Sequence, residues 1–139
     1  MSDTPMQALL RALDALDLEA AVALFAPDAT LSMLFGETAT GRDRVREVLG
    51  EFIRELRANH HEVSAEWNPE PGVWLAEMSA TYELADFSRR GPYGRVMVLR
   101  AGDDGIEQLR SYGAHELPLA QDGRPYENVR GPHGWLPTL

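Results

Sequence analysis

The amino-acid sequence predicts an α+β domain in which helices come first and a mostly antiparallel sheet follows. Apolar residues recur at helical spacing within residues 5–16, 18–25 and 44–56. After residue 60 the apolar period changes to two, and turn clusters separate the alternating segments, as in successive β-hairpins. We therefore expect about three helices, packed against the one apolar face that the hairpin strands share.

Two short helices are predicted at the start. Thr4 can cap the first, and Pro5 fits its first position because no hydrogen bond is lost there. Its apolar stripe consists of Met6, Leu9, Leu10, Leu13 and Leu16. Asp17 can cap the second helix, which Pro27 and Asp28 end. The second apolar face consists of Leu18, Ala21, Val22 and Phe25.

A strand over residues 29–34 and a longer helix are expected next. The strand has Leu31 and Met33 on one side. Thr40 and Asp43 have the spacing of a capping box just before a periodic apolar run, so they predict the start of the helix. That helix presents one apolar face, made of Val45, Val48, Leu49, Phe52, Ile53 and Leu56.

The remaining strands are predicted from alternation and from turn residues. The first, from residue 60, places His61, Val63, Ala65 and Trp67 on one face. The next strand, 73–84, directs Trp74, Met78 and Tyr82 inward. Turns are expected at 68–72, 89–94 and 102–105, and the last two strands at 95–101 and 106–114.

Length and charge narrow the class of protein. The chain of 139 residues fits one domain over 1–116, followed by a Pro- and Gly-rich extension over 117–139. Its net charge of −9 argues against nucleic acid and membrane surfaces as partners. No apolar run approaches the ~20 residues of a membrane span, and residues 1–5 do not resemble a secretory signal. A cytoplasmic location is the expectation.

The sequence carries no recognisable metal or cofactor motif. His60 and His61 are adjacent in a strand, so their side chains point apart and cannot share an ion. The chain has no cysteine. Neither a glycine-rich nucleotide loop nor a serine-hydrolase elbow occurs. We therefore expect a protein that works without a metal or cofactor.

One part of the sequence resembles a known family. It consists of residues 23–31, the segment Thr40-Gly41-Arg42-Asp43 and the helix that follows. The segment resembles the opening of the nuclear transport factor 2-like superfamily, which includes ketosteroid isomerase and SnoaL-like polyketide cyclases. The resemblance covers about residues 6 to 115. It implies a cone in which a strongly curved sheet and the helices enclose an apolar pocket.

The best-known catalytic groups of that superfamily are not carried over. The ketosteroid isomerase base falls at Met33, its tyrosine near Leu9 and its aspartate near Met97, and none of these side chains transfers a proton. Limonene epoxide hydrolase uses an Asp-Arg-Asp group. Arg95 lies at the arginine position, but its acids fall at Met97 and near Ser111.

SnoaL-like cyclases are the looser match, and they imply an acid/base group in an apolar pocket. Candidate catalytic residues are His61, Tyr82, Arg95 and His115. Candidate substrate-binding residues are Leu31, Met33, Phe52, Leu56, Trp67, Met78, Met97 and Ser111. Most have a structural alternative: His61 could be a partly exposed cap at the start of a strand, the tyrosine could be a core residue, the arginine could pair at the surface, and the methionines could fill the cavity.

Two functions follow from this interpretation. One is a cofactor-independent cyclase, isomerase or epoxide hydrolase acting on a small, apolar, oxygenated molecule. The alternative is a non-catalytic ligand-binding or assembly module of the same fold. Either is expected to form a homodimer through the outer sheet face, whose apolar residues are Val73, Leu75, Val96 and Val98.

Overall fold

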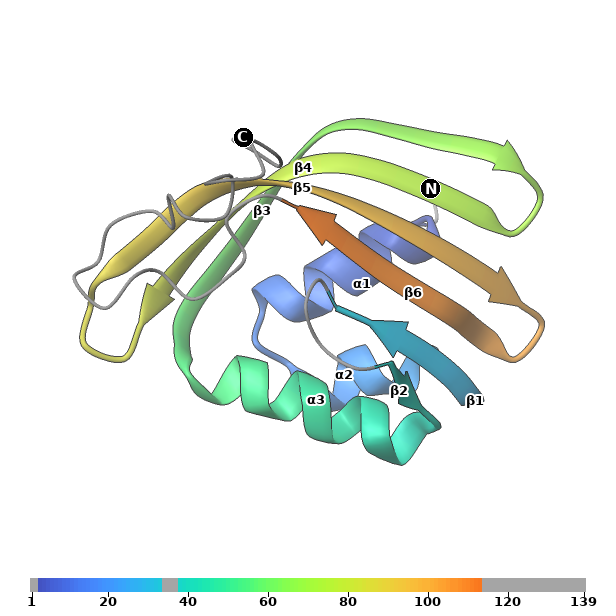
Figure 1. Ribbon diagram of the computed structural model, residues 1–139, viewed down its shortest axis with the longest axis horizontal. Helices are drawn as coiled ribbons and strands as arrows, with labels where there is room; N and C mark the ends of the chain where they lie inside the picture. Colours follow the sequence, from blue (N-terminus) through green and yellow to red (C-terminus); the bar gives the residue numbers. More distant parts are fainter. Residues whose placement is uncertain (1–2, 34–37, 114–139) are drawn as a thin grey trace, which may run out of the picture.

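The computed structural model describes residues 3–33 and 38–113. These residues form three helices and one curved six-stranded sheet (Figure 1). The elements are α1 (Pro5–Asp14), α2 (Leu18–Ala23), β1 (Phe25–Ser32), β2 (Ala39–Thr40), α3 (Arg42–Arg54), β3 (Leu56–Glu70), β4 (Val73–Leu84), β5 (Arg89–Gly102) and β6 (Gly105–Gly113). The expected α+β cone is therefore confirmed. His115 and the extension over 117–139 lie outside the described residues.

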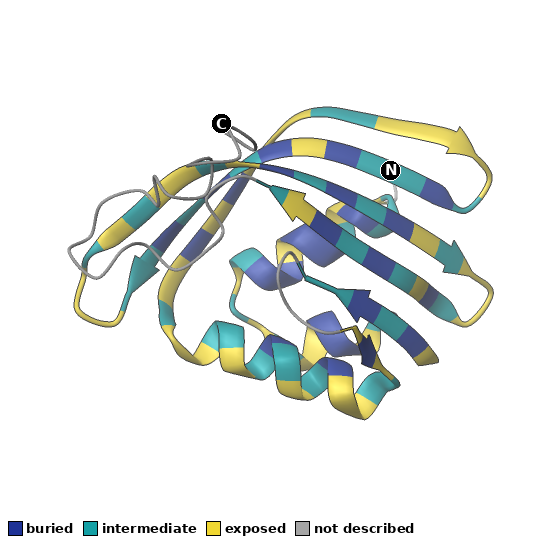
Figure 2. Cartoon of the chain, viewed as in Figure 1, coloured by how far each residue is buried: buried dark blue, intermediate teal, exposed yellow. Residues whose placement is uncertain are grey.

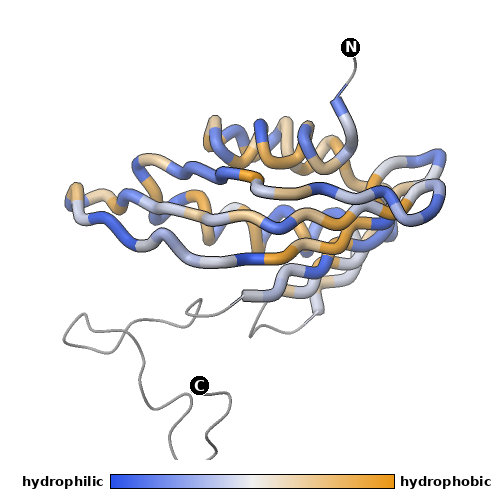
Figure 3. Tube along the Cα trace, turned by 90° about the horizontal axis from the view of Figure 1, so that it is seen from above, coloured by the Kyte–Doolittle hydropathy of each residue, from blue (hydrophilic) through white to orange (hydrophobic). Residues whose placement is uncertain are grey.

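The strand order is β2-β1-β6-β5-β4-β3, and every pairing is antiparallel except β1 with β6. The helices lie on one side of the sheet, which curves around them (Figures 1 and 3). Buried and less buried residues alternate along the central strands, as a sheet with one covered face requires (Figure 2). The core lies between this inner face and the helices; its largest fully buried side chains include Phe25, Met6, Leu9, Leu31 and Leu99.

The first two helices begin at the predicted caps. The hydroxyl of Thr4 accepts a hydrogen bond from the backbone N–H of Gln7 at 3.0 Å, and the Gln7 side chain accepts one from the Thr4 N–H at 3.1 Å. Asp17 accepts from the Ala20 N–H at 3.0 Å. Both helices end earlier in the chain than the sequence predicts. Leu16 lies beyond α1 with a φ of 56°, and Phe25 is the first residue of β1.

The predicted capping box of the third helix is wrong. Gly41 is the residue before α3, with a φ of 92° and no capping side chain, while Thr40 belongs to β2. The Gly41 N–H donates to the Ala29 carbonyl at 2.8 Å, so the chain is still attached to the sheet edge when the helix begins. Leu56, predicted on this helix, is the first residue of β3.

Strand β3 starts four residues earlier than predicted and contains a β-bulge. His61 pairs with Ala80 and Val63 with Met78, but Ala65 pairs with Glu77, so Ser64 is an extra residue. One extra residue reverses which side chains face the core. Trp67 consequently pairs with Leu75 on the outer face and is 52% exposed. Its predicted place on the inner face with His61 is therefore wrong.

The β4–β5 hairpin also differs from the expected one. Strand β5 begins at Arg89, and the turn lies at residues 85–88 instead of 89–94. The Asp86 carboxylate closes this turn by accepting from the Ser88 N–H at 3.0 Å. None of the helices in the described ranges is long and apolar enough to cross a bilayer.

Candidate functional site

The inner face of the sheet carries four buried polar side chains. Asn59 and His61 come from β3, Arg95 from β5 and Ser111 from β6, and each is at most 8% exposed. Removing a polar group from water is costly unless it is hydrogen-bonded. Three of these residues form hydrogen bonds that connect β3 to α1 and β5 to β4. The inner face therefore carries a group of buried polar side chains within an apolar core, called the polar cluster below.

Asp14 and His61 form the most specific contact of this cluster. Asp14, the last residue of α1, places Oδ1 2.7 Å from the His61 ring Nδ1 and accepts from the His61 backbone N–H through Oδ2 at 3.1 Å. When the ring is neutral, a carboxylate at Nδ1 keeps the proton there and makes Nε2 the acceptor. The His61 side chain is 1% exposed, and Nε2 has no hydrogen-bond partner among the described residues.

Arg95 and Tyr82 form a second polar pair on the inner face. Arg95 Nη2 donates to the Tyr82 hydroxyl, and the guanidinium carbon lies 5.7 Å from the centre of the Tyr82 ring. The Phe52 ring meets Tyr82 edge-on at 5.5 Å between centroids, and the Tyr93 ring lies at 6.0 Å. A positive charge is thus held against an aromatic wall, where it can stabilise an oxygen that gains negative charge.

Strand register brings these two pairs together. His61 lies opposite Ala80 on β4, and Ala80 lies opposite Tyr93 on β5. Tyr82 lies two residues after Ala80 and Met78 two residues before it, so all three share one face of β4. Arg95 on β5 lies opposite Met78. Because Ala80 contributes only a methyl group, larger side chains from both neighbouring strands can converge above it.

Most of the other predicted site residues lie on the inner side. Those that are buried are Leu31, Met78, Met97 and Ser111. Met33 is half-buried and packs against the core, and Phe52 and Leu56 are half-buried as well. The expectation that Tyr82, Arg95 and His61 point inward agrees with their burial, whereas their catalytic role stays a prediction.

Two polar residues of the cluster were missed from the sequence. Asp14 lies at a helix end and 47 residues from His61, and no local pattern connects them. Asn59 had a detectable signal, because it precedes His61 by two residues and so shares its face once β3 is known to start at residue 56.

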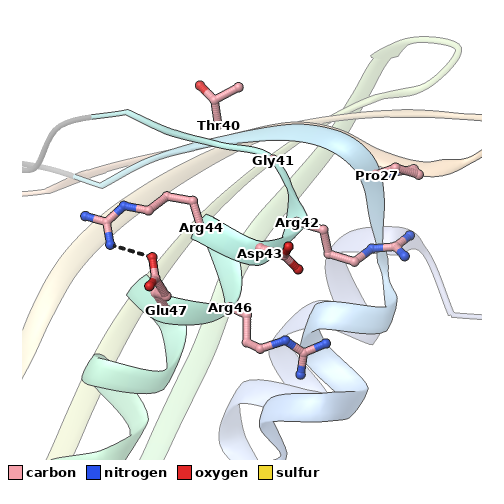
Figure 4. A pocket seen from close by; sticks show the side chains of 8 residues that line it. All are labelled: Pro27, Thr40, Gly41, Arg42, Asp43, Arg44, Arg46 and Glu47. Carbon is pink, nitrogen blue, oxygen red and sulfur yellow. Dashed lines mark hydrogen bonds and ion pairs between the residues drawn. The ribbon is translucent and has the colours of Figure 1, made fainter.

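A surface pocket of about 760 Å³ lies at the start of α3 (Figure 4), and none of its lining residues belongs to this cluster. Its arginines already have partners: Arg42 donates to the Phe25 carbonyl, Arg44 lies 3.0 Å from Glu47, and Arg46 pairs with Glu19. The pocket is therefore a charged surface groove whose arginines are already engaged by protein groups. Within the described ranges, no three His, Asp or Glu side chains lie close enough to hold a metal ion.

The sequence matches the SnoaL-like domain family over residues 6–110. The chain therefore belongs to this family, as the resemblance implied. Comparison with curated proteins gives no match.

Solved structures show the same fold. A hypothetical protein with a ketosteroid isomerase-like fold from Catenulispora acidiphila, in complex with trimethylamine, is similar with a TM-score of 0.75 and 19% identity; the match covers 90% of this chain and 96% of that one. A ketosteroid isomerase-like protein from Erwinia carotovora gives 0.62 and 17%, over 78% and 90%. A LEH-like epoxide hydrolase from M. tuberculosis gives 0.67 and 16%, over 78% and 79%.

Proposed function

We propose that the protein is a cofactor-independent acid/base enzyme in which His61 removes a proton from a small, apolar carbonyl compound. The observation that carries this proposal is the Asp14–His61 contact, which leaves a buried ring nitrogen without a partner. Burial and a fixed tautomer prepare Nε2 to accept a proton from a ligand on the inner face. A proton removed next to a carbonyl and returned elsewhere gives isomerisation, and an enolate that attacks a second carbonyl gives cyclisation.

Arg95 and Tyr82 supply the complementary function. When His61 takes a proton from carbon, negative charge develops on the carbonyl oxygen. The Arg95 guanidinium beside Tyr82 can stabilise that charge strongly, because the group is only 4% exposed and the surrounding wall is aromatic. With His61 as the base and Arg95 as the group that stabilises the oxygen, no carboxyl group is needed at Met33 or Met97. These are the positions at which ketosteroid isomerase and limonene epoxide hydrolase carry carboxyl groups.

Exchange of deuterium into ketones tests the proposed base. The protein is mixed with α-tetralone and other cyclic ketones in D₂O, and NMR follows the loss of the α-proton signal. The wild type is expected to accelerate exchange, and His61→Gln to reduce the acceleration by about 10²–10⁴-fold. The matched control is His60→Gln, because His60 is the exposed neighbour on the opposite face of β3 and its loss should change nothing.

The same assay separates the other functions. Exchange that survives in His61→Gln would show that another group is the base. Epoxides that gain the mass of water without ketone exchange would indicate a hydrolase, the activity of the M. tuberculosis relative. Ligands that raise the melting temperature without exchange or turnover would favour the non-catalytic binding module.

We also propose that two copies of the chain pair through the outer sheet face. One cross-strand row there runs from Trp67 through Leu75 and Val98 to Arg110. Trp67 is 52% exposed, and it borders a depression of about 450 Å³ lined also by Asn68, Pro69 and Leu75. An exposed aromatic on an apolar sheet face is typical of an interface.

Sedimentation at micromolar concentration tests the dimer. The wild type is expected to sediment as a dimer and Trp67→Glu as a monomer with unchanged circular dichroism. A monomeric wild type would contradict the proposal. Val73, which was expected to contribute, is only 7% exposed, so Val73→Glu is not a suitable probe because it would disturb folding.

A further inference from the structure

The buried amide of Asn59 has one half of its hydrogen-bonding capacity fixed and the other half unused. Nδ2 donates to the Leu13 carbonyl of α1 at 3.2 Å, and this bond sets which way round the amide lies. Oδ1 is therefore the atom that remains, and it is buried with no partner among the described residues. The residue as a whole is 5% exposed. A buried carbonyl oxygen of this kind is normally paired, so Oδ1 is an acceptor in need of a donor.

Asn59 lies where a ligand of His61 would reach it. The two residues are separated by one position on β3, so their side chains share the inner face and their Cα atoms are about 6.8 Å apart along the strand. Tyr82 lies directly opposite Asn59 on β4, and its hydroxyl accepts from Arg95. The inner face thus offers two acceptors on β3, Asn59 Oδ1 and His61 Nε2, and a cationic donor on β5. Two acceptors two residues apart on one strand can contact different groups of the same small molecule.

We infer that Asn59 determines substrate specificity by accepting a hydrogen bond from a hydroxyl group of the molecule that His61 acts on. The inference rests on the proposed function in taking the same site, and it narrows the substrate to a hydroxylated ketone. An ammonium donor is disfavoured, because Arg95 places a positive charge on the same face.

Binding of matched ketones tests this assignment. Dissociation constants are measured by NMR titration for α-tetralone and for each of its ring-hydroxylated derivatives. At least one hydroxylated derivative should bind the wild type about 3- to 10-fold more tightly than α-tetralone. In Asn59→Leu, which keeps the side-chain size and removes the acceptor, this preference should fall to about one, while α-tetralone binding stays within about twofold.

Two further variants keep the test informative. Thr81→Val alters a polar side chain on β4 next to Tyr82 but on the opposite face, so the preference should persist. Should Asn59→Leu fail to fold, Asn59→Ala provides the same loss of the acceptor with less demand on packing. The ratio of two affinities in one variant reports recognition of the hydroxyl, which a purely structural role of Asn59 would not change.

The outcomes also separate this inference from the proposed function. His61→Gln should lose exchange activity and keep the preference for the hydroxylated ketone. A preference that survives in Asn59→Leu, or a wild type that binds none of the hydroxylated ketones more tightly than α-tetralone, would overturn the role of Asn59. Exchange that the wild type shows and His61→Gln loses would in either case leave His61 as the base, so the two conclusions can fail independently.

Discussion

Asp14 holds His61 through both of its carboxylate oxygens, one on the ring and one on the backbone N–H. The contact joins the end of α1 to β3 and fixes the ring relative to its own strand. A ligand-binding or catalytic histidine benefits from such double attachment, because a fixed ring loses little conformational freedom when it acts. The same contact also connects the helix layer to the sheet, so it should affect stability as well as chemistry.

Asp14→Ala is expected to lower the free energy of unfolding by about 1–3 kcal/mol, because two His61 donors lose their acceptor within a largely buried region. Asp14→Asn keeps one accepting oxygen and should lose less. Urea denaturation measures both. A second measurement is the ring ¹⁵N spectrum of His61, in which the wild type should show the proton on Nδ1. Equal stability of all three proteins would contradict a structural role for this contact.

Deletion of Ser64 is expected to leave the protein folded. Ser64 is the extra residue of the β3 bulge, so its removal makes the β3–β4 pairing regular between His61 and Trp67, and both residues keep their faces. The free energy of unfolding should fall by about 0.5–1.5 kcal/mol, because the hydrogen bond from the Ser64 hydroxyl to the Glu77 carbonyl is lost. Deletion of Ala76, which pairs on both sides in β4, is the control and should prevent folding. If the Ala76 deletion folds and the Ser64 deletion does not, Ser64 is not the extra residue of a bulge.

Local signals in the sequence predicted local structure well. Thr4 and Asp17 cap their helices because a cap is set by residues three positions apart. The alternation in β4 gave the correct faces for Met78 and Tyr82, since the strand is regular there. The family resemblance supplied the curved sheet, which periodicity alone does not determine.

The errors have nonlocal or conformational causes. Trp67 was assigned to the wrong face because a one-residue bulge is not visible in a pattern of alternation. Asp14 was missed as the partner of His61, because helix packing brings together residues that are 47 positions apart. The Thr40 cap failed because a glycine conformation, and no side chain, begins α3.

Gly41 provides a test of that last point. Its φ of 92° and ψ of 147° belong to a region that is almost restricted to glycine, although a Cβ would meet no atom within 4 Å. Gly41→Ala should therefore lower the free energy of unfolding by about 1–3 kcal/mol through backbone strain alone. Gly94 in β5 has equal room and no positive φ, so Gly94→Ala should be neutral or stabilising by about 0.5–1 kcal/mol. If both substitutions change the melting temperature equally, the positive φ of Gly41 does not contribute to stability.

Asp86 predicts how the β4–β5 turn responds to acid. Hydrogen bonds from the Ser88 hydroxyl at 2.5 Å and from its N–H at 3.0 Å lower the pKa of Asp86, because they favour the ionised carboxylate. A pKa that is lower in the folded than in the unfolded chain stabilises the turn above the unfolded pKa, and the stabilisation is lost as the pH falls through the folded pKa.

Ser88→Ala removes the stronger of these bonds and should raise the pKa of Asp86 toward its ordinary value. An NMR titration of the Asp86 side chain in acid measures this shift directly. Asp86→Asn should also make stability less dependent on pH in the acid range, since the group that changes charge is gone. Ser79→Ala in β4 is the control, because that serine lies away from the turn, opposite Gly94. An Asp86 titration that is unchanged in Ser88→Ala would show that another group lowers its pKa.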